Sequence, residues 1–340
     1  MATLLSELCA RTRLDCDTMD VDFAKEFGPF ADCTSNQSIS YTEASRTTPD
    51  GKLVHEDYIK EAAEWAQRAV NEPDAGGDSI ETLAVEYLVV KLLLRFAPHV
   101  RSYLLLQINP KDAYDTNKIV ATAERIISMT KKIDASFDVK RLCFKVVSTW
   151  PGLQACRILE EKGVATLGTA LFCMEQATLA GHVGCTYISP YYNELRVHID
   201  KDYTDNNKAS TLPRDATAYF SAHHHKTQIK SASLVTPEEA MHHAGVDSIT
   251  LFPPIIRSLA SSPAESMPRA EVGKFMVPPT ISPAEGWKVY EEAIEGGREA
   301  WEAQFEKSGG GESARKLKEA IAAFSKAQDD LEDLVKRVAA

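Results

Sequence analysis

Lys145 is the first residue whose setting suggests chemistry, because it lies in the apolar and β-branched segment RLCFKVVST. A lysine ammonium loses hydration when it is buried, so its pKa falls and the neutral amine becomes a nucleophile toward a carbonyl carbon. A lysine near a strand end can instead extend its ammonium into solvent. The segment therefore allows two interpretations, a Schiff-base lysine or an ordinary surface lysine.

Polar side chains near the ends of other expected strands could assist such an amine. The two-residue period of a strand puts Asp15 and Asp17 of LDCDTMD on one face. The Asp17 carboxylate could carry protons to and from a substrate hydroxyl, or it could cap the next helix. Tyr191 should point to the same side as Ser189, so that its phenol could donate or hold a water. The polar residues at these ends are Gln107, Thr169, Ser189 and Tyr191.

Short apolar runs alternate with longer segments of helical periodicity, a pattern typical of parallel β/α units. Eight strands are expected, the number that a closed barrel needs. They are Leu14–Asp17, Phe30–Thr34, Ser102–Ile108, Leu142–Val147, Thr166–Phe172, Thr186–Ser189, Lys230–Leu234 and Ser248–Phe252.

Helices are expected between these strands, and three of them end at a glycine suited to a left-handed C-cap. These three are Trp150–Glu161 before Gly163, Glu175–Val183 before Gly184, and Pro237–His243 before Gly245. We predict an α/β fold, a single (β/α)8 TIM barrel over residues 1–340. The additional C-terminal amphipathic helix, 312–338, is expected to pack on the outside of the barrel.

The net charge of the chain argues against some classes of binding partner. It has 340 residues with 38 Lys and Arg against 49 Asp and Glu, a formal net charge of −11. This acidity argues against nucleic acid or an anionic membrane as a partner, since phosphate binding needs a basic face. No apolar run approaches the roughly 18 residues of a membrane span, and the N-terminal segment lacks the apolar stretch of a signal peptide. We therefore expect a soluble, cytoplasmic protein.

Cysteines and histidines do not form a recognisable metal motif. The seven cysteines lack a C-x-x-C pair and indicate buried free thiols. The runs at 223–225 and 242–243 invite a metal interpretation, but adjacent side chains on a helix diverge by about 100° per residue. Surface helix histidines and no metal are expected. No G-x-G-x-x-G, Walker or G-x-S-x-G motif occurs, so no cofactor is expected.

Six segments resemble motifs of the transaldolase family in the right order along nearly the whole chain, which makes the likeness specific. They are Cys16–Asp20 (CDTMD), Asp32–Ser38 (DCTSNQS), Phe144–Gly152 (FKVVSTWPG), Thr169–Gln176 (TALFCMEQ), Tyr187–Tyr191 (YISPY) and the terminal helix Leu317–Val335.

The resemblance implies that Lys145 forms a Schiff base with a ketose, with Asp17 as general acid/base. The iminium is an electron sink, so cleavage of the C3–C4 bond leaves an enamine that waits for an aldehyde. Thr169 would help to position a catalytic water. Substrate contacts are implied for Thr34, Asn36 and Ser189. The partner would be a small carbonyl or sugar-like molecule, and a homodimer through the outer helices rests on the likeness alone.

Four departures from the family pattern concern the site. The family's catalytic glutamate falls on Gln107, and an amide cannot act as a base. Its first phosphate-binding arginine falls on Glu194, and the second falls at or beside Leu234 and Val235. A family phenylalanine is Tyr191 here. A glutamine together with a tyrosine resembles the related fructose-6-phosphate aldolases, in which the free aldol reaction is favoured over transfer.

Loss of two arginines and gain of a carboxylate should weaken phosphate binding, unless Arg196 or Lys230 takes over. We therefore predict a Schiff-base enzyme for aldol cleavage, condensation or dihydroxyacetone-type transfer, acting on a carbonyl substrate that is non-phosphorylated or differently anchored. Two alternatives stay open. One is a conventional transaldolase of the pentose phosphate pathway, and the other is a non-catalytic barrel that binds a metabolite or a partner.

Overall fold

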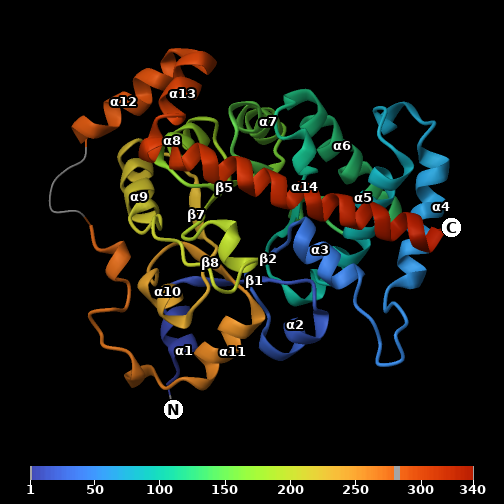
Figure 1. The fold of residues 1–340 in the computed structure, drawn as a ribbon, viewed down its shortest axis with the longest axis horizontal. Coiled ribbons are helices and arrows are strands. Elements are labelled where there is room, and N and C mark those ends of the chain that lie inside the picture. Colours follow the sequence, from blue (N-terminus) through green and yellow to red (C-terminus); the bar gives the residue numbers. More distant parts are fainter. Residues whose placement is uncertain (1, 279–283, 340) are drawn as a thin grey trace.

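The computed structural model describes residues 2–278 and 284–339, and its centre is a closed barrel of eight parallel strands in chain order (Figure 1). This confirms the predicted (β/α)8 TIM barrel. The strands are β1 Arg13–Asp17, β2 Cys33–Thr34, β3 Leu104–Gln107, β4 Leu142–Val147, β5 Ala165–Leu171, β6 Tyr187–Pro190, β7 Gln228–Ser231 and β8 Ser248–Leu251.

All strand bounds lie within three residues of those expected, and β4 has the bounds predicted. The largest differences are the end of β7 and the start of β2, where Phe30 forms only an isolated bridge with Val100 before the strand begins. The barrel closes where β8 pairs with β1, with Arg13 opposite Ser248.

Helices surround the barrel. They are α1 Leu4–Cys9, α2 Val21–Phe27, α3 Gln37–Ala44, α4 Glu56–Ala69, α5 Ile80–Leu94, α6 Thr116–Ile133, α7 Trp150–Glu161, α8 Met174–His182, α9 Leu212–Ala222, α10 Pro237–His242, α11 Pro253–Ser261, α12 Ala284–Glu295, α13 Gly297–Phe305 and α14 Glu312–Ala339. Of these, α7, α8, α10 and α14 correspond to the four predicted by range from the sequence.

Three of these helices end at the expected glycines. Gly163, Gly184 and Gly245 follow α7, α8 and α10 with φ of 75°, 81° and 107°. A positive φ carries no steric penalty at glycine, so the chain can turn sharply from each of these helices into the next strand. The repeated β/α unit thus rests on local signals that the sequence carries.

The helix α14 packs on the outside of the barrel, as expected, but it also extends over the barrel mouth, which the sequence did not indicate. It crosses the molecule from the side of α8 toward α4 and α5 (Figure 1), and it packs against α3, α4 and α5. Its residues Ala323 and Phe324 line the cavity described below. The amphipathic pattern gives the apolar face of a helix but not its partner, and here that face covers part of the barrel mouth.

A buried charge cluster lies inside the barrel, away from the mouth. The Lys230 ammonium contacts the carboxylates of Asp15 and Asp32, 3.0 Å from Oδ2 of the latter, and donates to Ser248 Oγ at 3.1 Å. All four side chains are buried. Asp15 and Asp17, predicted to share one face of β1, therefore differ in role: Asp15 belongs to the ion cluster and Asp17 lines the cavity.

All seven cysteines are free thiols, as predicted, and six are buried, but the expectation of burial is wrong for Cys9, which is exposed. In the described part of the chain, no helix is long and apolar enough to cross a membrane.

Candidate active site

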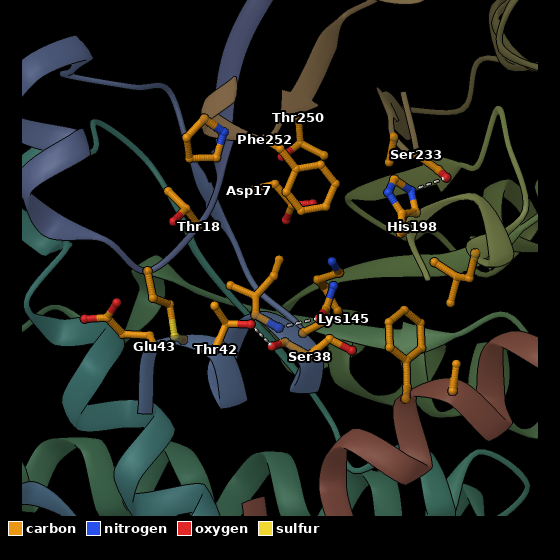
Figure 2. Close-up of a pocket in the computed structure, with 18 of the residues that line it drawn as sticks. Asp17, Thr18, Ser38, Thr42, Glu43, Lys145, His198, Ser233, Thr250 and Phe252 are labelled. Atoms are coloured by element: carbon orange, nitrogen blue, oxygen red, sulfur yellow. Dashed lines mark hydrogen bonds between the residues drawn. The ribbon is translucent and has the colours of Figure 1, made fainter. Parts of the chain in front are cut away.

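A cavity of about 530 Å³ opens at the carboxyl ends of the strands, where barrels of this type carry their reactive groups. Four of the residues singled out from the sequence line it: Asp17 at the end of β1, Asn36 before α3, Lys145 in β4 and Tyr191 just after β6. Figure 2 shows Asp17, Lys145 and His198 around the same hollow. Residues from distant parts of the sequence thus meet in one place.

Lys145 is buried, with 4 % of its surface exposed, in a strand that is buried along its whole length. It lies opposite Gln107 on β3 and Leu167 on β5. Burial lowers the pKa of the Lys145 amine, and the charge of Asp17 opposes that shift. The alternative of a surface lysine is wrong, because β4 continues past residue 145 under the cover of its neighbours.

Asp17 is held by hydroxyl groups instead of capping a helix. Thr34 Oγ1 donates to Asp17 Oδ1 at 2.6 Å and lies 2.6 Å from Thr250 Oγ1. The cap of α2 is Asp20, whose carboxylate accepts from the Asp22 amide. Burial raises the pKa of Asp17, against the opposing effects of Lys145 and of the Thr34 hydrogen bond. Thr34 thus orients Asp17.

Of three further polar residues predicted for the site, Tyr191 lines the cavity, whereas Gln107, opposite Lys145 on β3, and Thr169 are buried outside its lining. The hydroxyls of Thr169 and Tyr191 are 3.2 Å apart, and Tyr191 packs edge-on against Phe172. The side-chain amide of Gln107 is buried, and neither its oxygen nor its nitrogen has a hydrogen-bond partner. Since buried polar atoms are normally paired, this amide is suited to hold a water or a substrate hydroxyl near Lys145.

Asn36 has one half of its amide committed to the fold. Its Oδ1 accepts from the Ile39 amide at 3.0 Å as the N-cap of α3, which leaves the NH2 group as the donor suited to a ligand. The sequence suggested a substrate contact at this position, and the residue does line the cavity.

Ser189 and Arg196, two of the predicted substrate contacts, do not line the cavity. Ser189 is buried, and its hydroxyl donates to the Lys230 carbonyl oxygen at 3.0 Å, so it ties β6 to β7. Arg196 is exposed, pairs with Asp200 at 2.9 Å and lies over the Tyr203 ring, outside the cavity lining. Lys230, the other suggested replacement for a phosphate anchor, belongs to the ion cluster inside the barrel.

Glu194, which occupies the position of the family's first phosphate-binding arginine, forms an ion pair within the protein. Glu194 is buried, and Arg315 of α14 pairs with it at 2.6 Å. The Glu194 amide donates to Asp205, which Lys316 of α14 contacts at 2.9 Å. The sequence signals the unusual glutamate but not its partner, which lies more than a hundred positions away.

Sequence reasoning missed His198, which lies in the loop after β6 and lines the cavity. Its Nε2 is 2.9 Å from the Ser233 hydroxyl, and its ring lies 5.3 Å from that of Phe252 (Figure 2). Burial lowers the pKa of His198, with an opposing effect from Asp17. Ser233 adopts φ of 58°, a strained conformation that functional sites often contain. No local motif marks His198.

The expectation of surface histidines is wrong for His243, which is buried and whose two ring nitrogens have no hydrogen-bond partner in the described part of the chain. His223 pairs with Glu291 at 2.7 Å, His242 pairs with Glu271 at 3.0 Å, and His243 is buried between the Tyr192 and Phe275 rings. Within residues 2–278 and 284–339, no group of three His, Cys, Asp or Glu could hold a metal ion.

Comparisons with known proteins agree with this geometry. The family model described as Transaldolase/Fructose-6-phosphate aldolase matches residues 14–335. A transaldolase of Shewanella denitrificans is 28 % identical over 272 residues, which cover 77 % of this chain and 80 % of that protein. A probable transaldolase of Dictyostelium discoideum is 28 % identical, covering 78 % and 80 %. A transaldolase of Shewanella loihica is 25 % identical over 86 % of this chain and 91 % of its own length.

Proposed function

The chain belongs to the transaldolase/fructose-6-phosphate aldolase family, and on this premise we propose that Lys145 is the amine that forms the Schiff base with a sugar-like ketone. The observation that carries the proposal is the burial of Lys145 on the wall of the cavity that Asp17 also lines. Burial favours the neutral amine, which is the form that can attack a carbonyl carbon.

The first half of the reaction makes the iminium. The Lys145 nitrogen lone pair attacks the ketone carbon, and the carbonyl oxygen takes up a proton to give a carbinolamine. Loss of that hydroxyl as water then leaves the protonated Schiff base. The hydroxyl pair of Thr169 and Tyr191 and the unpartnered amide of Gln107 hold this water and donate the hydrogen bonds that help it leave.

The second half breaks or makes a carbon–carbon bond. Asp17 accepts the proton of the substrate hydroxyl, the C3–C4 bond breaks, and its electron pair moves into the iminium to form an enamine. An aldehyde leaves. The enamine then either adds to a second aldehyde, with Asp17 returning its proton, or is protonated as in a free aldol cleavage. In both cases water adds to the resulting iminium carbon, which releases the ketone and restores the Lys145 amine.

Two alternatives are not favoured. A conventional transaldolase of phosphosugars would use the arginines of the family pattern, whereas the corresponding positions hold Glu194, paired with Arg315, and Leu234 or Val235. A non-catalytic binding barrel would have no use for a buried lysine and a buried aspartate beside unpartnered polar atoms, which are costly to keep in a fold.

The proposal is tested by reductive trapping. The protein is incubated with hydroxyacetone or dihydroxyacetone and cyanoborohydride, and the adduct is located by mass spectrometry. We expect a stable adduct at Lys145 that is absent from the Lys145→Met variant, whose folding is checked by circular dichroism. Lys230 is the internal control, because it is equally buried but held by two carboxylates. Absence of any adduct at Lys145, or the same labelling of Lys230, would overturn the proposal.

A further inference from the structure

The wall of the cavity beyond the reactive groups is mainly apolar. Its large apolar side chains come from five separate parts of the chain. They are Met19, Ile39, Leu195, Ile199, Phe252 and Phe324. Ile199 has 73 % of its surface exposed, the highest fraction among the large hydrophobic residues described as exposed. An exposed isoleucine at the rim of a site is the kind of surface that an apolar ligand can cover.

The cations near this wall are already paired with carboxylates. Arg315 contacts Glu194 at 2.6 Å and also pairs with Glu312 and Glu319. Arg46, which lines the cavity, lies 3.2 Å from Glu43 and 3.6 Å from Asp20. A phosphate would have to compete with these carboxylates for each guanidinium.

The charges on the lining itself are unfavourable for an anion. Three carboxylates line the cavity, from Asp17, Asp20 and Glu43, against the side chains of Lys145 and Arg46. Glu43 is also contacted at 3.4 Å by Arg95, which lies outside the lining. Formation of the Schiff base requires Lys145 to lose its proton first, which makes the balance more negative when the substrate enters. A dianionic group would therefore lose its hydration without finding a guanidinium on the lining that is free of a carboxylate.

We propose that this site takes a ketone whose end remote from the carbonyl is uncharged and apolar, and that this end packs against Leu195, Ile199, Phe252 and Phe324. The inference rests on the proposed Schiff-base function and specifies its substrate class. Phe324 is contributed by α14, so the terminal helix selects the substrate as well as covering the barrel mouth. The polar end of the same molecule meets Asp17, Asn36 and Lys145.

A homologous series of 1-hydroxy-2-ketones tests the proposal. Each is trapped with cyanoborohydride over a range of concentrations, from hydroxyacetone to the ketone with a six-carbon tail. Burial of a methylene contributes roughly fourfold in affinity. We expect half-maximal trapping at a concentration that falls twofold to fourfold with each added carbon until the cavity is filled. Dihydroxyacetone phosphate should need at least about tenfold more than dihydroxyacetone.

Two variants assign the effect to the apolar wall. Ile199→Ser and Phe324→Ser should flatten the dependence on chain length, measured as the ratio between the longest and the shortest ketone. The matched control is Val289→Ser, which also replaces an exposed aliphatic side chain but lies in α12, outside the cavity lining. This control should keep the ratio of the unaltered protein.

The possible outcomes distinguish a failure of the apolar-tail inference from a failure of the proposed Schiff-base function. Trapping at Lys145 without dependence on chain length, or a stronger response to the phosphorylated ketone, would overturn the apolar-tail inference and leave the proposed function standing. Failure to trap any ketone would overturn the proposed function itself. An equal loss of the ratio in Val289→Ser would show that the wall is not the cause.

Discussion

At Lys145, two opposing effects set the proton affinity of the reactive amine. Burial lowers its pKa, because the charged form loses hydration, and the nearby Asp17 carboxylate raises it by stabilising the ammonium. The result is a pKa below the ordinary value of 10.5. The negative charge of Asp17 therefore has two opposing effects. It allows Asp17 to act as a base, and it also stabilises the protonated form of Lys145, which cannot attack a carbonyl.

This opposition predicts the pH dependence of trapping. The neutral fraction of an amine increases with pH, so adduct formation at Lys145 should rise with pH and reach half its maximum below pH 10.5. In Asp17→Asn the opposing charge is gone, and the midpoint should move to lower pH. The rate of aldol cleavage of a ketone with a β-hydroxyl should nevertheless fall by about 10²–10⁴-fold, because the base that accepts the hydroxyl proton is lost. The measurement is the initial rate of cyanoborohydride trapping at a series of pH values.

Asp22→Asn is the control for the midpoint. Asp22 is an exposed carboxylate in α2 that pairs with Lys25, and it should leave the midpoint where it is. A midpoint that moves upward in Asp17→Asn, or one that moves equally in both variants, would contradict the assigned coupling.

The Tyr191 phenol offers a second prediction for a single residue. Burial raises its pKa, so the hydroxyl remains protonated at neutral pH and can donate a hydrogen bond. Tyr191→Phe keeps the ring contact with Phe172 and removes only the oxygen that lies 3.2 Å from Thr169. We expect kcat for aldol cleavage of a ketone that carries a hydroxyl on its β-carbon to fall by about 10²–10⁴-fold if this oxygen moves protons, with a small effect on KM.

The neighbouring Tyr192 supplies the comparison. It is also a buried phenol, but its ring packs on His243 and it lies outside the cavity lining. Tyr192→Phe should keep kcat within about twofold. Equal losses in the two variants would assign the effect at Tyr191 to packing and not to proton transfer.

Among the elements, α14, the last helix of the chain, is held at the barrel mouth by ion pairs. Lys316 is buried and contacts Asp205 at 2.9 Å, and Asp205 also accepts from the amides of Glu194 and Asn207. Breaking a buried ion pair by removing one partner costs about 3–5 kcal/mol, because the other charge is left without compensation. This pair therefore fixes the loop after β6 to the terminal helix.

We expect Lys316→Met to lower the free energy of unfolding by about 3–5 kcal/mol. The measurement is urea denaturation followed by circular dichroism. Lys318→Met is the matched control, because Lys318 is two positions away on the same helix, is 65 % exposed and lies 3.6 Å from Glu306. An exposed pair of this kind contributes less than about 1 kcal/mol. Similar losses in both variants would show that the Asp205 contact does not hold the helix in place.

The elements also show how far the sequence alone could lead. The bounds of β4 and α7 were predictable, because local signals define them: an apolar run, the Thr149 cap and Pro151 in the first turn. The placement of α14 over the mouth was not, since it depends on Phe324 and on ion pairs with residues about 110 to 120 positions earlier. Helical periodicity contains no information about such partners.

The same distinction applies within the site. Lys145, Asp17, Asn36 and Tyr191 were predictable because they stand at strand ends or in recognisable motifs. Ser189 fits those criteria too, yet its hydroxyl is used by the Lys230 carbonyl, a contact that only the closed barrel creates. His198 has no local signal and enters the cavity through the path of its loop.

For the molecule as a whole, the ion cluster inside the barrel links strands from both halves of the chain. Lys230 of β7 contacts Asp15 of β1 and Asp32 next to β2, and both carboxylates also accept backbone amides: Asp15 from Asp32, and Asp32 from Tyr103. Burial raises the pKa of Asp15 to about 6, with opposing stabilisation from Lys230. Since the cluster closes the barrel, its loss should affect global stability and not only the site.

The last prediction concerns Lys230→Met, which leaves the two carboxylates buried without their cation. We expect a loss of about 3–5 kcal/mol in the free energy of unfolding at neutral pH. Without Lys230 the pKa of Asp15 rises further, so the folded state binds more protons than the unfolded state, and stability falls as pH increases through that range. The variant should therefore be closer in stability to the unaltered protein at pH 5 than at pH 8.

Urea denaturation at these two pH values is the measurement, and Lys230→Met/Asp15→Asn is the companion variant. The asparagine keeps an oxygen that can accept from the Asp32 amide but removes one buried charge, so it should recover part of the loss at pH 8 and little at pH 5. A loss that is the same at both pH values, and that Asp15→Asn does not relieve, would mean that the lysine contributes through the volume of its side chain. In that case the charge cluster would not be what closes β7 and β8 onto β1.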